Sequence, residues 1–178
     1  MKQTHIFKDP PGVIASAAVG GKMEGEGPMG EYFDKINDDP YMSADTFEKG
    51  ESKLQKQALL HMLEKAGLKE AEIDLLFGGD LLNQCTGTTY GIREFGIPFL
   101  GLYGACSTMA EGLLMASAFT AAGYAKRAAA VTSSHFCSAE RQYRYPLNYG
   151  GQRPPTAQWT ATAGGALCVS AEGRSPYV

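Results

Sequence analysis

The feature that most constrains the fold is an alternation of short apolar segments with longer segments of helical pattern. Glu48–Ala66 has apolar residues at the spacing of one buried helix face, and Gly67 follows as a stop signal. Two further segments are predicted to be helical, Thr86–Phe95 and Cys106–Ala122. Apolar runs predict buried strands at Ile73–Phe77, Ile97–Leu102, Ala128–Thr132 and Gly164–Ala171. This alternation predicts an α/β fold with a mainly parallel sheet and helices on both faces.

The N-terminal region lacks such a pattern. Gly12–Gly30 is rich in glycine and other small residues, and the polar stretch Asp34–Pro40 follows it. Both stretches are predicted to be extended, looped structure without a regular element.

Length and composition favour one globular domain over residues 1–178, because a chain with 44% apolar residues can bury one core. The net charge is -3 and the basic residues are scattered, which argues against a nucleic-acid partner. The longest apolar stretches, such as Leu113–Ala122, are shorter than the roughly 20 residues of a membrane span. The N-terminus has no apolar segment of the signal-peptide kind, so we expect no signal peptide and a reducing compartment.

The four cysteines are far apart in the sequence and form no C-x-x-C pair. This spacing argues against both a zinc site and a disulfide framework. We therefore predict no metal site and no bound cofactor.

Cys106 lies where a predicted strand ends and a long helix begins. At a helix N-terminus, unpaired N–H groups and the helix dipole stabilise a thiolate and offer donors to an anionic or carbonyl oxygen. The small neighbours Gly104 and Ala105 would let a ligand approach the backbone. Cys106 is therefore a candidate reactive residue, and an inert packed thiol is an equal alternative.

Five ordered sequence blocks resemble the stage V sporulation protein AD family. They are GDLLNQ (Gly79–Gln84), PFLGLYGACST (Pro98–Thr108), TSSH (Thr132–His135), AERQYRYP (Ala139–Pro146) and YGGQRP (Tyr149–Pro154). The earlier run GEGPMGEYFD (Gly25–Asp34) is similar too. The resemblance covers nearly the whole chain and is to the N-terminal half of the family.

The resemblance implies a thiolase-like fold, of which this chain would be one half of the duplicated whole. Cys106 then matches the nucleophile position of thiolases and ketoacyl-ACP synthases. Condensing enzymes complete their site with residues of the second half, so the resemblance assigns no partner base in this chain. His135 is the one histidine beside the motif blocks.

The resemblance also implies a ligand, dipicolinic acid, bound alone or as its calcium chelate. This flat pyridine carries two carboxylates, so it suits bidentate guanidinium groups, amide donors and an aromatic face. The run Glu140–Tyr145, with Gln152 after it, supplies all three kinds of group. Arg141 and Arg144 would face one pocket from a helical turn and diverge from an extended segment. On composition alone, a solvated charged face is the favoured alternative.

Two polar residues, Asp80 and Asn83, follow the first predicted strand. They would gather at the carboxyl end of the sheet, where open α/β folds bind ligands, or serve equally well as helix N-caps. The expected ligand-binding residues are Asn83, Cys106, His135, Glu140, Arg141, Arg144 and Gln152.

Two functions compete. The first is a non-enzymatic binding protein for dipicolinate uptake into the forespore during sporulation. By resemblance it would be a homodimer, associated peripherally with the spore inner membrane and with other proteins of the same operon. The second is an acyltransferase of the thiolase or ketoacyl synthase type that uses Cys106 as nucleophile. The first is favoured, because two nearby arginines suit a dicarboxylate better than a thioester carbonyl.

Overall fold

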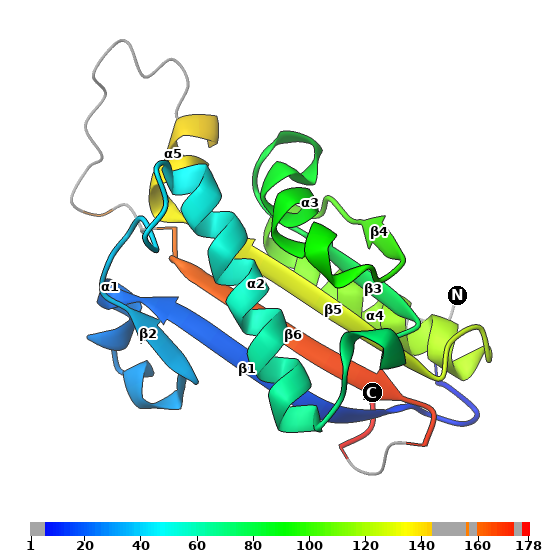
Figure 1. The fold of residues 1–178 in the computed structure, drawn as a ribbon. Coiled ribbons are helices and arrows are strands. Elements are labelled where there is room, and N and C mark those ends of the chain that lie inside the picture. The colour runs from blue at the N-terminus through cyan, green and yellow to red at the C-terminus, as the bar shows by residue number, and fades with distance from the viewer. Residues whose placement is uncertain (1–5, 144–155, 157–159, 173–175) are drawn as a thin grey trace.

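The sheet of this protein has six strands in the order β2-β1-β6-β5-β3-β4 (Figure 1). A computed structural model describes residues 6–143, 156, 160–172 and 176–178. The strands are β1 Gly12–Gly21, β2 Lys35–Asn37, β3 Leu75–Gly79, β4 Phe99–Gly101, β5 Arg127–Ser134 and β6 Ala163–Ser170. The α-helices are α1 Lys22–Gly25, α2 Phe47–Ala66, α3 Thr86–Ile92, α4 Thr108–Ala121 and α5 Phe136–Tyr143.

The strand directions are mixed. The pairs β1–β2, β3–β4 and β3–β5 are parallel, as the alternation of strands and helices predicts. Strand β6 runs antiparallel to both of its neighbours, β1 and β5. The α/β prediction is confirmed, and β6 adds an antiparallel centre that local sequence patterns do not reveal.

The prediction that Gly12–Gly30 and Asp34–Pro40 contain no regular element is wrong. Gly12–Gly21 is the ten-residue strand β1, and Lys35–Asn37 is strand β2. The small residues of β1 give no recognisable strand pattern, yet β1 pairs with β6 along nearly its whole length. Val19, opposite Gly164, is fully buried in the core. Strand β1 therefore owes its conformation to pairing with β6, which lies roughly 150 positions later in the chain.

Helices cover both faces of the sheet, as predicted. In Figure 1, α2 crosses the front face and α4 lies behind the sheet. Adjacent strand residues point to opposite faces. In β3, Leu76 belongs to the core under α2, whereas Phe77 belongs to the core under α4. In β6, Cys168 and Val169 divide in the same way, so the sheet separates two apolar layers.

Helix α2 confirms the clearest sequence prediction. The Thr46 hydroxyl accepts a hydrogen bond from the N–H of Lys49 at 3.2 Å and caps the helix. Gly67 ends the helix in the left-handed conformation, with φ of 65°. The predicted stripe, which includes Leu54 and Met62, is buried against the sheet.

Two elements differ from expectation in exposure. The predicted strand Ile97–Leu102 is reduced to the three-residue edge strand β4, and Leu100 on it is 43% exposed. Helix α4 is mostly apolar, with Glu111 as its one charged residue, and one side of it lies in solvent, where Leu114 is 56% exposed. No helix in the described part of the chain is long and apolar enough to span a membrane.

Candidate functional site

A cavity of about 770 Å³ is lined by Cys106. We call it the Cys106 cavity. It opens where β3 and β5 end and β6 begins, at the first residues of α4. Its described walls are Ala18, Phe33, Gly79, Asp80, Leu81, Ala105, Cys106, Thr108, Met109, Thr132, Ser133, Ser134, Thr160, Ala161, Ala163, Gly164 and Gly165. Carboxyl ends of parallel strands are the usual binding edge of an α/β sheet, so its position fits a ligand site.

The turn that carries Cys106 is held by its own hydrogen bonds. The Thr108 hydroxyl donates to the Ala105 carbonyl at 2.8 Å and accepts from the Gly104 N–H at 3.1 Å. Ser107 donates its hydroxyl to the Gly104 carbonyl at 2.7 Å. Ala105 has φ of 49°, a conformation that non-glycine residues adopt only when their surroundings enforce it. This turn leaves Cys106 exposed at the cavity wall.

The N-terminus of α4 is available to a ligand in the cavity. Thr108 and Met109, its first two residues, both line the Cys106 cavity. Ser107 at the N-cap makes no side-chain hydrogen bond to the first turn of the helix. A 14-residue helix directs the positive end of its dipole at this point, where Glu111 in the first turn of the helix supplies one negative charge.

Asp80 also lines the cavity, but its carboxylate is hydrogen-bonded to the neighbouring backbone. It accepts hydrogen bonds from the N–H of Leu82 at 2.8 Å and from the N–H and the hydroxyl of Thr88, both at 2.6 Å. A side chain at Gly87 would come within 3.1 Å of the Asp80 carboxyl carbon. Asp80 is not an N-cap, because Leu82 and Cys85 occupy the N-cap positions of the 3-10 turn and of α3; its carboxylate instead holds α3 against the end of β3.

Asn83 lies on the exposed surface of a 3-10 turn, Asn83–Cys85. Its backbone carbonyl accepts a hydrogen bond from the Thr86 hydroxyl at 2.6 Å. It is not among the described residues that line the Cys106 cavity. A ligand role for Asn83 stays a prediction.

His135 is fully buried, and both of its ring nitrogens form hydrogen bonds within the protein. The N–H of Cys137 donates to its Nδ1 at 3.2 Å, which assigns the ring proton to Nε2. Nε2 then donates to the Pro40 carbonyl at 2.7 Å. The ring also lies against Phe47 and Phe136. His135 is therefore placed apart from the described cavity walls, and its predicted ligand contact stays untested.

The other predicted ligand residues lie outside what the structure describes. Glu140 and Arg141 lie on α5, but their side chains are outside the described part. Arg144 and Gln152 lie outside the described residues altogether. Among the described residues, no cluster of three or more histidine, cysteine or acidic side chains is arranged to hold a metal ion.

A buried polar layer beside the cavity was missed by sequence reasoning. Glu51 of α2 is fully buried and accepts hydrogen bonds from Ser133 at 3.1 Å and from Ser138 of α5. Gln55, one turn later and also fully buried, donates to the Gly79 carbonyl at 3.1 Å. Both follow the four-residue spacing of the buried stripe of α2, which was the available signal.

The pKa of Glu51 is shifted toward neutral pH. Burial raises the pKa of Glu51 to about 7, and the nearby carboxylate of Asp80 also raises it. The hydrogen bonds from Ser138 and Ser133 act in the opposite direction. The site thus contains one buried carboxyl that exchanges its proton in the physiological range.

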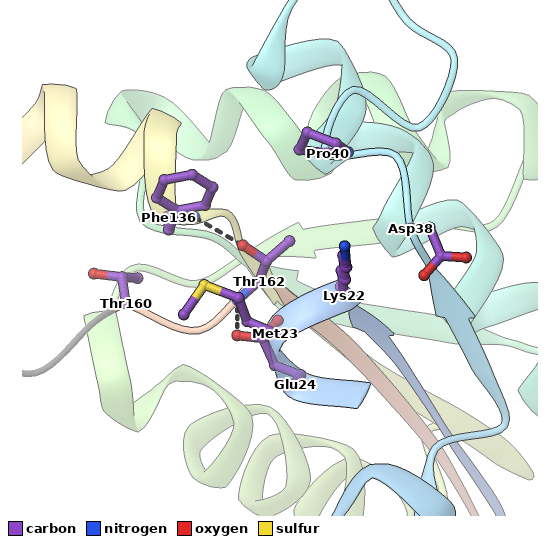
Figure 2. A pocket seen from close by; sticks show the side chains of 9 residues that line it. Lys22, Met23, Glu24, Asp38, Pro40, Phe136, Thr160 and Thr162 are labelled. Carbon is purple, nitrogen blue, oxygen red and sulfur yellow. Dashed lines mark hydrogen bonds between the residues drawn. The ribbon is translucent and has the colours of Figure 1, made fainter. Parts of the chain in front are cut away.

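A smaller pocket of about 220 Å³ adjoins the cavity and shares Thr160 with it. Figure 2 shows Glu24 of α1 and Phe136 of α5 on either side of Thr162. The Glu24 carboxylate accepts from the Thr162 N–H at 3.0 Å, and the Thr162 hydroxyl accepts from the Phe136 N–H at 3.1 Å (Figure 2). These bonds fix the approach to β6 between α1 and α5.

Solved structures of condensing enzymes share this fold. The 3-oxoacyl-[acyl-carrier-protein] synthase III of Aquifex aeolicus VF5 superposes with a TM-score of 0.60 at 18% identity, covering 93% of this chain and 54% of that one. An OleA variant of Xanthomonas campestris gives a TM-score of 0.60 at 12% identity, covering 93% and 57%. At these identities the similarity shows the thiolase-like fold alone.

A sequence relative is much closer. The stage V sporulation protein AD of Bacillus subtilis (strain 168) is 45% identical over 169 residues, which cover 95% of this chain and 50% of that protein. The chain thus spans about half the length of this curated relative. The family model for Stage V sporulation protein AD matches residues 1–178. On this match and this identity, the chain belongs to the stage V sporulation protein AD family, a family of sporulation proteins.

Proposed function

We propose that the protein containing this chain binds dipicolinate in the Cys106 cavity and does so without chemical turnover. The observation that carries the proposal is the wall where α4 begins, because the first two residues of that helix, Thr108 and Met109, line the cavity and Ser107 makes no side-chain capping bond. Backbone N–H groups at such a position bind carboxylates. The hydroxyls of Thr132, Ser134 and Thr160 add further hydrogen-bonding groups to the same walls.

The walls also suit the aromatic ring of the ligand. Phe33 and Met109 provide apolar surface to the cavity. A flat dicarboxylate can therefore place its ring on apolar side chains while one carboxylate meets the start of α4. The second carboxylate calls for cations, and Arg141 and Arg144 are the residues we expect to supply them.

The wider biological role follows from family membership. We propose that the protein takes part in loading dipicolinate into the forespore, alone or as its calcium chelate. Its partners would be other proteins of the same sporulation operon, at the inner membrane of the spore. Within the described residues, edge strand β4 pairs on one side only, which supports a homodimer formed through the sheet. The second half of the longer protein is expected to complete the pocket.

Calorimetric titration of the complete protein with dipicolinate tests the proposal. Saturable binding is expected, and Arg144→Ala should weaken it by roughly tenfold or more because a charged hydrogen bond is lost. Thr132→Val keeps the side-chain shape and removes a cavity hydroxyl, so a smaller loss is expected. Thr89→Val, on the exposed surface of α3, serves as the matched control. The proposal would be wrong if the folded protein showed no saturable binding of dipicolinate.

The competing function is acyl transfer. It is favoured by one observation, the exposed Cys106 thiol at the start of α4. The thiolate would attack a thioester carbonyl, the acyl group would pass to sulfur, and the original thiol would leave. Incubation with acyl thioesters followed by intact mass spectrometry decides the matter: a trapped acyl-enzyme supports transfer, and unmodified protein supports binding alone.

A further inference from the structure

The end of the Met109 side chain covers a bare stretch of β6 in the Cys106 cavity. Gly165 of β6 has no side chain, and a Cβ atom at that position would lie 3.3 Å from Met109 Cε. Both residues line the cavity, and so does Thr132, which lies opposite Gly165 on β5. Met109 therefore fills the space that a side chain at Gly165 would otherwise occupy.

Further along α4, the helix lies directly on the sheet. Gly112 packs so closely on β5 that a Cβ atom there would lie 3.0 Å from the Cβ of Ala130. On β6, the next residue on the same face as Gly165 is Leu167, which packs into the apolar core under α4. Among these described residues, close packing stops a ligand from extending along α4 beyond Met109.

The position and the type of this side chain suit a wall that ligands touch. Met109 is half-buried and follows the turn that carries Cys106 at the start of α4. A methionine side chain is unbranched and flexible, so it fits itself to the surface that it covers. Met109 thus determines how deep the cavity is between α4 and β6.

We propose that Met109 sets the size limit for ligands in the Cys106 cavity. It admits short or flat ligands and excludes extended alkyl or acyl chains from the space between α4 and β6. The inference rests on the proposed function in taking this cavity as the ligand site. A flat dicarboxylate meets the limit, and an acyltransferase that worked here would be restricted to short acyl groups.

Thiol reagents of two chain lengths test the inference on the complete protein. Methyl and hexyl methanethiosulfonate each transfer an alkylthio group to the sulfur of Cys106, and methanesulfinate leaves. Peptide mass spectrometry gives the ratio of the hexyl rate to the methyl rate at Cys106. Dividing by the same ratio for glutathione removes the difference in intrinsic reactivity, and circular dichroism verifies that each variant is folded.

Met109→Ala should raise this normalised ratio roughly tenfold, which is the effect of burying about two more methylene groups. Gly165→Ala should lower it roughly twofold, because the added methyl group presses Met109 toward the cavity. Met115→Ala is the matched control, since it shortens a half-buried methionine of α4 that is not among the described cavity walls. Its ratio should equal that of the unaltered protein.

The inference is overturned if Met109→Ala keeps the ratio of the unaltered protein, or if Met115→Ala raises it as much. Should Met109→Ala not fold, Gly165→Ala decides alone, and an unchanged ratio there would overturn the inference. Failure of dipicolinate to bind would instead contradict the proposed function and leave the chain-length result standing.

Discussion

The ring of His135 and the carbonyl of Pro40 are joined by a 2.7 Å hydrogen bond that spans 95 positions of sequence. It attaches the loop before α2 to the segment between β5 and α5. We predict that His135→Ala lowers the free energy of unfolding of the complete protein by roughly 2–4 kcal/mol, because a buried ring and its hydrogen bonds are lost. Urea unfolding measures this.

His61 on α2 offers the matched control, since its side chain is 32% exposed, whereas that of His135 is fully buried. His61→Ala should change the unfolding free energy by less than about 0.5 kcal/mol. Equal effects of the two substitutions would show that the bond to Pro40 contributes little.

Cysteine accessibility predicts an order of thiol reactivity. Cys106 is exposed, whereas Cys85 and Cys168 are buried, and burial raises the pKa of Cys168 to about 12. Because the thiolate is the reactive form, iodoacetamide should modify Cys106 at least roughly tenfold faster than Cys168. Time-resolved peptide mass spectrometry gives the two rates.

The same reaction reports on the ligand site. Dipicolinate bound in the Cys106 cavity should slow modification of Cys106 and leave the rate at Cys137, which lies outside the described cavity walls, unchanged. Protection of both cysteines alike would indicate general tightening of the fold rather than occupancy of the cavity.

The buried carboxyl of Glu51 should make stability depend on pH. Its folded pKa, about 7, lies above the ordinary value of 4.5, so the folded protein retains a proton that the unfolded chain releases. This contribution is fully present below pH 4.5 and is lost as the pH rises to 7, by roughly 3 kcal/mol in total. Glu51→Gln should flatten the decline, as measured by urea unfolding from pH 4.5 to 8.

Glu64 provides the comparison for this pH series, because its side chain on α2 is 80% exposed. Glu64→Gln should retain the decline seen in the unaltered protein. A Glu51→Gln profile that follows the unaltered one would place the responsible group elsewhere.

We predict that the Asp80 carboxylate stabilises the fold. Asp80→Asn would turn an amide donor toward the N–H and hydroxyl of Thr88, both of which donate to the native carboxylate. We expect a loss of roughly 2–4 kcal/mol in unfolding free energy, because buried donors lose their acceptor. Asp45→Asn, at an exposed ion pair with Lys49, should cost much less, because solvent screens the attraction between exposed charges. Similar losses would argue against this stabilising role.

The parts of the fold that sequence could predict are those defined by local pattern. Helix α2 has its buried stripe, cap and stop within one stretch of chain, and β5 contains the continuous apolar run Ala128–Val131. Strand β1 could not be predicted, because Ala, Ser and Gly favour no periodicity and only pairing with β6 makes it a strand. The direction of β6 likewise depends on distant partners.

The residues of the candidate site also fall into those that local sequence predicts and those that depend on distant contacts. Cys106 was predictable because a strand end and a helix start are both visible in the sequence around it. The burial of His135 was not, because it depends on a loop 95 positions earlier. The burial of Glu51 could have been predicted, because an acidic residue in register with a buried helix stripe indicates a buried charge. Its hydrogen bonds could not, because Ser133 lies on β5 and Ser138 on α5.

The outward side of α4 bears on how the protein should be handled. A helix that is mostly apolar gains most when every side is covered. Ala110, Leu114 and Ala121 lie open instead on the described surface. Preparations of these 178 residues alone would carry that patch into solution, where exposed apolar surface promotes self-association. Aggregation of such a preparation on concentration would reflect this exposed side of α4 rather than a defect in folding.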